Sequence, residues 1–221
     1  MSDYDAVLLD LDGTLCEYVR GKRELLAAAF ESEGVDPLFT AADYAERVDS
    51  YADRADSMGE RRRLCFADLA AENGHDPAVG RAVADAYAAA RDHGNVRFLD
   101  GAETALSHLA DRYPLGLVTN GGPGMQDPKI DGIGVRERFE TVVYAGHDVP
   151  AKPAPDPFVV ALEDLGVRPE RTVYVGNNYE TDILGAAEAD VPAILLGDAP
   201  ADAPVDPVAT IERPGELTDL L

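Results

Sequence analysis

The stretch DAVLLDLDGTL (residues 5–15) runs from consecutive apolar residues into two aspartates, Asp10 and Asp12, and then into a Gly-Thr pair. A short, uninterrupted apolar run is typical of a strand buried on both faces of a parallel sheet. Carboxylates this close repel each other unless a proton or a divalent cation separates them. The stretch therefore predicts a buried strand that ends in a chemical site.

Similar apolar runs recur along the chain and alternate with helical patterns. Further strands are expected at 115–120, 141–146, 171–177 and 192–197, with a short edge strand near 208–211. Apolar spacings of three and four residues predict helices at 101–111, 124–137, 155–165 and 180–189. This alternation implies a parallel sheet with right-handed crossovers. The predicted fold class is α/β, with a Rossmann-like three-layer core.

The segment from 17 to 95 breaks this alternation, because no convincing strand pattern occurs within it. Its helical patterns cover 22–34, 40–57, 60–73 and 78–92. Short stretches rich in Gly, Asn, Asp and Pro separate them. We therefore expect a core formed by residues 1–16 and 96–221, with an all-helical insert at 17–95.

The composition is strongly acidic, with 42 Asp and Glu against 19 Lys and Arg and a net charge of −23. This balance disfavours nucleic-acid binding, because lysines and arginines are needed to neutralise phosphates. Only Lys22, Lys129 and Lys152 are lysines. An acidic, lysine-poor surface is typical of halophilic proteins, in which salt screens the self-repulsion. A lysine near a chemical motif is notable in such a chain.

No apolar stretch reaches the roughly 18 residues of a membrane-spanning helix, and the first residues are acidic rather than basic and then apolar. We therefore expect a cytoplasmic protein with no signal peptide and no membrane partner. Cys16 and Cys65 lie far apart and form no metal motif. Both are expected to be reduced thiols in apolar surroundings.

Polar side chains follow each predicted strand, and ligands of open α/β sheets bind outside the carboxyl ends of the strands. The side chains that should gather there are those of Asp10, Asp12, Thr119, Asn120, Lys152, Asn177, Asn178 and Asp182. Mg²⁺ prefers one or two carboxylates together with waters and a phosphate. Lysine and hydroxyl groups suit the remaining phosphate oxygens. One aspartate could then attack phosphorus while the other acts as general acid and base.

Four segments resemble the haloacid dehalogenase superfamily of phosphohydrolases. They are DLDGTL, VTNG, KPAPDPF and VGNNYETDILGA, in that order along the chain. The resemblance covers essentially the whole chain and implies a Rossmann-like core, with the helical insert as a cap domain over the site. It also implies a Mg²⁺-dependent phosphatase that acts on a small phosphorylated molecule, such as a sugar phosphate, glycolate phosphate or nucleotide.

The resemblance further implies a role for each matched residue. Asp10 would be the nucleophile and a Mg²⁺ ligand. Asp12 would protonate the leaving group and then activate water, and its backbone carbonyl would also meet the metal. Catalytic or phosphate-binding roles fall on Gly13, Thr14, Thr119, Asn120 and Lys152. Metal-supporting roles fall on Asn177 and Asp182.

Asn177 departs from the family pattern, in which an aspartate usually follows this glycine and binds Mg²⁺ directly. An amide oxygen can still bind a cation but carries no charge. We therefore expect weaker Mg²⁺ binding, or Asp182 as a direct ligand. The dehalogenase branch also has an asparagine in this motif and uses no metal, but it lacks an acid at the position of Asp12. Asp12 therefore favours phosphoryl chemistry.

Two alternatives remain at the level of sequence. One is another reaction on the same scaffold: a phosphomutase, a phosphonatase that would need Lys22 for a Schiff base, or a dehalogenase. The other is a binding or regulatory protein whose catalysis Asn177 has weakened. The oligomeric state, monomer or homodimer, is equally open.

Overall fold

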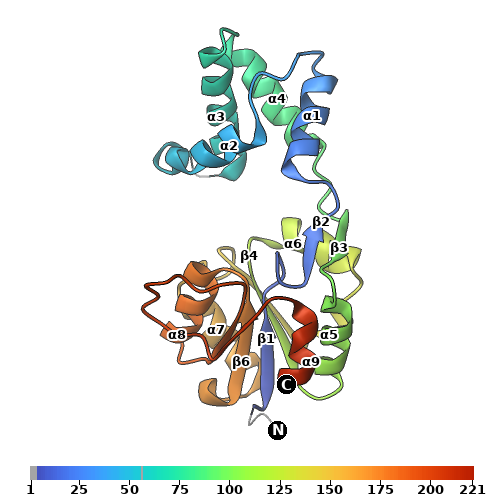
Figure 1. The fold of residues 1–221 in the computed structure, drawn as a ribbon, viewed down its shortest axis with the longest axis vertical. Coiled ribbons are helices and arrows are strands. Elements are labelled where there is room, and N and C mark those ends of the chain that lie inside the picture. The colour runs from blue at the N-terminus through green and yellow to red at the C-terminus, as the bar shows by residue number, and fades with distance from the viewer. Residues whose placement is uncertain (1–3, 56) are drawn as a thin grey trace. The chain divides into compact units, whose positions relative to one another are not determined.

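The apolar runs predicted as strands form one parallel six-stranded sheet in the computed structural model, which describes residues 4–55 and 57–221 (Figure 1). The strand order is β5-β4-β1-β6-β7-β8. These strands span Ala6–Leu9 (β1), Leu115–Asn120 (β4), Thr141–Ala145 (β5), Thr172–Gly176 (β6), Ala193–Leu196 (β7) and Ala209–Ile211 (β8). The predicted α/β fold class is confirmed.

Helices cover both faces of the sheet because successive residues of each central strand point to opposite sides. In β1, Val7 and Leu9 belong to one apolar cluster and Leu8 to the other, and all three are fully buried. The first cluster includes α5 (Ala102–Ala110) and α9 (Leu217–Leu220), and the second includes α7 (Asp156–Leu165) and α8 (Leu184–Glu188). Figure 1 shows these two pairs of helices on opposite faces.

The position of β1 determines where the site forms. It pairs in parallel with β4 on one side, Leu9 opposite Leu117, and with β6 on the other, Leu9 opposite Val175. The chain continues from β4 outward to β5 and then returns to the far side of β1 for β6. Such a reversal leaves a crevice at the carboxyl ends of the central strands.

The residues Val19–Asp92 form a second compact unit, separate from the unit formed by Met1–Tyr18 and His93–Leu221. Within its described residues, 19–55 and 57–92, the regular elements are all helical: α1 (Lys22–Ser32), α2 (Ala41–Arg47), η1 (Val48–Arg54), α3 (Met58–Glu72) and α4 (Pro77–Ala89). Its core is a cluster of edge-to-face aromatic rings that includes Phe39, Phe66 and Tyr87. This unit therefore has its own hydrophobic core.

Several local features differ from the sequence prediction. The helix expected at 124–137 ends earlier, as α6 (Pro123–Gly132), and a separate turn of helix, η2 (Arg136–Arg138), follows it. Residues Cys16–Tyr18 (β2) pair antiparallel with Val96–Phe98 (β3), although no strand was expected between 17 and 95. Strands this short show no alternation, so the prediction of a strand-free segment was wrong at its edge. The helix expected at 180–189 begins as a π-helix, η4 (Tyr179–Ile183), and continues as α8.

The remaining elements are short turns of helix. They are η3 (Pro169–Arg171) and η5 (Pro214–Glu216). Cys16 and Cys65 are both buried free thiols. Across residues 4–55 and 57–221, no helix combines the length and the apolar character needed to cross a bilayer.

Candidate active site

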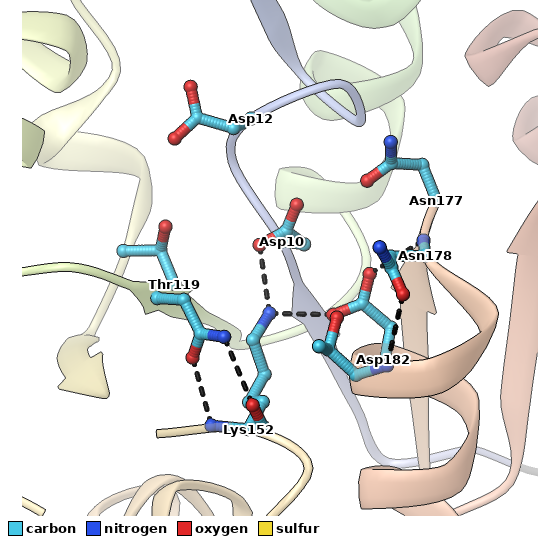
Figure 2. Close-up of a pocket in the computed structure, with 9 residues that line it drawn as sticks. Asp10, Asp12, Thr119, Lys152, Asn177, Asn178 and Asp182 are labelled. Atoms are coloured by element: carbon cyan, nitrogen blue, oxygen red, sulfur yellow. Dashed lines mark hydrogen bonds and ion pairs between the residues drawn. The ribbon is translucent and has the colours of Figure 1, made fainter. Parts of the chain in front are cut away.

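Strand-end side chains converge on one pocket of about 190 Å³ in the sheet unit (Figure 2). Its lining residues are Asp10, Asp12, Thr119, Asn120, Lys152, Asn177, Asn178, Thr181 and Asp182. Every residue that the sequence placed at the strand ends is among them. Gly13 and Thr14 form the turn that follows Asp12.

Asp10 lies where β1 ends, and its backbone N–H donates to the Val175 carbonyl of β6 at 2.9 Å. The residue is only 6% exposed. Its Oδ1 accepts a hydrogen bond from the Lys152 ammonium at 2.9 Å, and its Oδ2 accepts one from the Thr14 hydroxyl at 3.3 Å. The weakly engaged Oδ2 is therefore the oxygen that a cation or a phosphorus atom could approach.

Lys152 has its ammonium surrounded by oxygens. Besides Asp10, Nζ contacts Asp182 Oδ1 at 2.7 Å, the Tyr174 hydroxyl at 2.6 Å and the Val118 carbonyl at 3.0 Å. Burial alone would lower the pKa of Lys152, but the neighbouring Asp10 and Asp182 carboxylates raise it above its ordinary value. Lys152 is therefore a fixed positive charge beneath the pocket.

At Asp10, unlike at Lys152, the effect of burial on the pKa outweighs the effect of the neighbouring opposite charge. Burial raises its pKa from 3.8 to about 6; the Lys152 ammonium opposes this shift, and the Asp182 carboxylate reinforces it. Two buried carboxylates thus share one buried cation. The ionised form of Asp10 is costly and correspondingly reactive.

Asp182 is held entirely by the protein. Its Oδ1 accepts from Lys152 and from Tyr174, the latter at 3.0 Å, and its Oδ2 accepts from the backbone N–H of Asn178 at 2.9 Å. Its side chain is 2% exposed. A Cβ at Gly176 would lie 2.5 Å from Asp182 Cγ, so the carboxylate reaches this place only because residue 176 is glycine. Both oxygens of Asp182 are therefore already engaged by protein groups, and its main partner at the site is the Lys152 ammonium.

Asn177 is exposed and lies over Gly13. Gly13 has φ +79°, and a Cβ there would lie 2.4 Å from Asn177 Nδ2. The amide oxygen Oδ1 meets the Thr14 hydroxyl at 3.4 Å. The Thr14 hydroxyl therefore lies between Asp10 Oδ2 and Asn177 Oδ1, the two oxygens that the predicted metal would share.

The donor set suits Mg²⁺ if a phosphate completes it. In the described parts of the chain, no group of three or more His, Cys, Asp or Glu side chains is arranged to hold a metal ion. Asp10 Oδ2 and Asn177 Oδ1 lie on either side of the Thr14 hydroxyl and offer one charged and one neutral oxygen. One carboxylate with neutral oxygens, waters and a substrate phosphate is a set that Mg²⁺ accepts.

Thr119 and Asn120 end β4, and their side chains differ in role. The Asn120 amide makes two hydrogen bonds with the backbone of Lys152, accepting from its N–H at 2.9 Å and donating to its carbonyl at 3.1 Å. It thereby fixes the loop that carries the lysine. Thr119 Oγ1 accepts from Gln126 at 2.8 Å and lines the pocket.

Three residues at the site were missed by the sequence interpretation: Gln126, Lys129 and Tyr174. Lys129 Nζ contacts both oxygens of Asp12, at 2.7 and 2.6 Å, and Gln126 Nε2 contacts one of them at 3.0 Å. The rarity of lysine was an available signal for Lys129. Tyr174 reads in sequence as an ordinary core residue of β6.

Comparisons with known proteins point to one family. A profile of haloacid dehalogenase-like hydrolases matches residues 4–190. A phosphoserine phosphatase from Thermus thermophilus is 32% identical over 164 residues, which are 73% of this chain and 64% of that protein. A glyceraldehyde 3-phosphate phosphatase from Methanothermobacter thermautotrophicus is 34% identical over 111 residues, which are 50% of this chain and 49% of that protein. The matches thus span about half to 64% of these relatives.

Solved structures resemble the whole chain. The HAD-hydrolase YfnB from Bacillus subtilis, bound to magnesium, has a TM-score of 0.79 at 22% identity and covers 99% of this chain and 98% of its own. A 2-haloacid dehalogenase from Pseudomonas syringae has a TM-score of 0.69 at 25% identity, with 98% and 97% coverage. Because the profile match extends from the first strand through the insert to the last site residue, the chain belongs to the haloacid dehalogenase-like hydrolases.

Proposed function

We propose that this protein is a Mg²⁺-dependent phosphatase that hydrolyses a small-molecule phosphomonoester through an aspartyl phosphate on Asp10. One observation carries the proposal. The buried carboxylate of Asp10 is paired with the buried ammonium of Lys152, and a second, half-exposed carboxylate, Asp12, follows two residues later in the same pocket. The phosphatase names of the curated relatives support it.

The first transfer uses Asp10 and Asp12 in different protonation states. A carboxylate oxygen of Asp10 forms a bond to phosphorus as the bond from phosphorus to the leaving oxygen breaks. The leaving oxygen keeps that electron pair and takes a proton from Asp12. Lys152 offsets the negative charge between nucleophile and phosphoryl group.

The second transfer returns the enzyme to its starting state. Asp12, now a carboxylate, takes a proton from water while the water oxygen bonds to phosphorus. The bond between phosphorus and Asp10 breaks, and Asp10 regains its electron pair as inorganic phosphate leaves. A bound Mg²⁺ would add charge stabilisation for the phosphoryl oxygens, held by Asp10, the Asp12 carbonyl and Asn177.

Substrate choice is assigned to the helical unit Val19–Asp92, which would act as a cap that excludes water from the reacting groups. The acidic, lysine-poor composition supports function at high salt, and we assign the protein to the cytoplasm. The pocket of about 190 Å³ is lined by polar and charged side chains, which suits the phosphoryl group of a small phosphorylated metabolite.

Dehalogenation of a 2-haloacid is the second candidate, and Asn177 is the observation that favours it. The 2-haloacid dehalogenase of Pseudomonas syringae gives this chemistry a precedent on the same fold. Asp12 counts against it, since a carboxylate held at the mouth of the pocket has no use in displacing a halide. The phosphatase remains the better-supported reaction.

The decisive assay compares phosphate release from p-nitrophenyl phosphate with bromide release from a 2-bromo acid, both in molar KCl with and without Mg²⁺; ion chromatography distinguishes the released bromide from the chloride of the medium. We expect Mg²⁺-dependent phosphate release and no halide. Asp10→Asn should abolish release, whereas Asp111→Asn, an exposed aspartate outside the pocket lining, should leave it unchanged. Halide release, or phosphate release that survives Asp10→Asn, would refute the proposal.

A separate variant, Asn177→Asp, tests whether Asn177 binds Mg²⁺. Asn177→Asp restores a charged oxygen at the position where Asp10 and Asn177 would share the cation. The Mg²⁺ concentration for half-maximal activity should fall. If it stays unchanged, Asn177 is not a ligand.

A further inference from the structure

Helix α6 presents two residues, Gln126 and Lys129, to the carboxylate of Asp12. They are three residues apart and therefore lie on one face of the helix. Lys129 Nζ reaches both carboxylate oxygens at 2.7 and 2.6 Å, and Gln126 Nε2 reaches Oδ2 at 3.0 Å. Both oxygens of Asp12 are thus held from the side of α6. Figure 2 shows the Asp12 side chain directed away from Asp10 and Asn177.

The burial of the two partners is unequal. The Lys129 side chain is 2% exposed, whereas that of Asp12 is 41% exposed. The Lys129 ammonium also lies 5.0 Å from the centre of the Tyr18 ring, which covers it. A substrate could therefore reach Asp12 but not Lys129. This excludes a direct substrate contact for the lysine and leaves a role exerted through Asp12.

The side-chain amide of Gln126 has its nitrogen in hydrogen-bonding contact with the site but leaves its oxygen unpaired within the described chain. Its Nε2 faces three oxygens: Asp12 Oδ2, Thr119 Oγ1 at 2.8 Å and the Asn120 carbonyl at 2.7 Å. Its own Oε1 is buried and has no hydrogen-bond partner among the described residues. A buried acceptor without a partner is unfavourable and calls for an explanation. Here the amide joins the loop after β1 to the end of β4.

We propose that Lys129 and Gln126 are positioning residues that hold the Asp12 carboxyl group in one orientation, apart from the Asp10 carboxylate, so that in its protonated form it can donate its proton to the leaving oxygen. The inference rests on the proposed phosphatase function and adds two residues to it. The positive charge of Lys129 also compensates the repulsion between the two acids that end the first strand. Asp12 without these partners would sample several rotamers and meet the leaving oxygen less often.

A comparison of leaving groups isolates this role. The p-nitrophenolate anion is stable near neutral pH and departs without a proton, whereas an alkoxide needs one. The ratio kcat/KM reports only the steps up to formation of the phosphoryl-enzyme, in which Asp12 acts as acid. Wild type, Asp12→Asn, Lys129→Met, Lys129→Arg and the double variant are assayed with p-nitrophenyl phosphate and with an alkyl phosphate.

We expect Lys129→Met to lower kcat/KM for the alkyl phosphate by about 10²-fold and that for p-nitrophenyl phosphate by much less, the pattern of lost general-acid catalysis. Lys129→Arg should restore most of the loss. Lys129→Met should add nothing in the Asp12→Asn background. Arg136→Met is the matched control, because it removes a cation that pairs with Asp127 and Asp131 of the same helix rather than with Asp12.

The possible results distinguish failure of the positioning role from failure of the proposed phosphatase function. If wild type and Asp12→Asn show the leaving-group dependence but Lys129→Met lowers both substrates equally, or neither, the positioning role is overturned alone. If no Asp10-dependent phosphate release occurs from either ester, the proposed function is overturned and this role with it. Should Lys129→Met fail to fold, Gln126→Leu carries the same comparison, with the same expected selectivity for the alkyl ester.

Discussion

At the scale of single residues, the site is governed by an imbalance of buried charge. Asp10 and Asp182 are both acids and share the single ammonium of Lys152, and all three side chains are at most 8% exposed. Tyr174 adds a neutral hydroxyl and no compensating charge. Removing the Lys152 ammonium and removing the Asp10 carboxylate should therefore have opposite effects on the free energy of unfolding.

Removing the base should be strongly destabilising. Lys152→Met leaves two buried carboxylates without their cation, and breaking a buried pair in this way costs about 3–5 kcal/mol of unfolding free energy. Urea denaturation above neutral pH measures it. Lys22→Met is the control, because Lys22 is exposed, and it should change the unfolding free energy by less than about 0.5 kcal/mol. Equal losses in the two variants would contradict the account.

Removing one acid should stabilise the protein, with a definite dependence on pH. The pKa of Asp10 is about 6 in the folded protein against an ordinary value of 3.8, so the folded state binds the proton more tightly. The contribution of Asp10 is thus fully favourable below the lower value and is lost as the pH rises through the higher one. Asp10→Asn should raise the unfolding free energy by about 1–3 kcal/mol near neutral pH.

The pH dependence of this stability gain shows whether the folded protein favours the protonated or the ionised form of Asp10. Urea denaturation of wild type and Asp10→Asn is compared at several pH values, and the gain should shrink as the pH falls below about 6. A gain that grows toward acid pH would mean that the folded protein favours the ionised form. Activity would be lost in the variant, an exchange of function for stability that is common at active sites.

At the scale of elements, the turn between β1 and β2 places the end of β1 against the end of β6. Gly13 has φ +79°, and its missing side chain leaves room for Asn177, whose Nδ2 would lie 2.4 Å from a Cβ. A left-handed backbone costs an alanine about 1 kcal/mol at any such position. The contact with Asn177 is an additional constraint specific to this turn.

A pair of glycine variants separates these two effects. Gly134 also has a left-handed backbone, φ +67°, but a Cβ added there would meet no atom within 4 Å. Gly13→Ala and Gly134→Ala should both lower the unfolding free energy by about 1 kcal/mol or more. Only Gly13→Ala should displace Asn177 and raise the Mg²⁺ concentration needed for activity. An unchanged Mg²⁺ requirement in Gly13→Ala would show that the Asn177 position does not matter.

Much of the element arrangement was predictable because it depends on local pattern. The apolar run 115–120 predicted β4 with both of its ends, and the strand ends correctly identified the pocket residues. The pairing of β2 with β3 was not predictable, since each is three residues long and their partners are about eighty residues apart. The contact of Lys129 with Asp12 depends on which face of α6 meets the β1 turn, and periodicity alone does not specify that choice.

At the scale of the whole molecule, apolar packing falls into separate cores and the charge is strongly one-sided. Two apolar clusters lie on the two faces of the sheet, and a third lies within the helical unit. The net charge of −23 adds self-repulsion to every folded part of the chain. Mobile ions screen this repulsion, because the Debye length falls to about 3 Å at molar salt.

Thermal stability should therefore depend on salt. The melting temperature should rise steadily from low ionic strength to molar KCl, with NaCl giving a similar effect if screening is the cause. Differential scanning calorimetry over a salt series measures it. A melting temperature that is flat or falls with salt would exclude the halophilic interpretation of the composition, while leaving the chemistry of the site untouched.

If Asp10 forms a covalent bond to phosphorus, the resulting aspartyl phosphate can be trapped and located in the sequence. The protein is mixed with Mg²⁺ and p-nitrophenyl phosphate in molar KCl, quenched with acid within the first turnover, reduced with borohydride and analysed by peptide mass spectrometry. We expect borohydride to reduce residue 10 alone, and we expect no reduced residue in Asp10→Asn. Reduction of a different residue, or turnover without any reduced residue, would contradict this expectation.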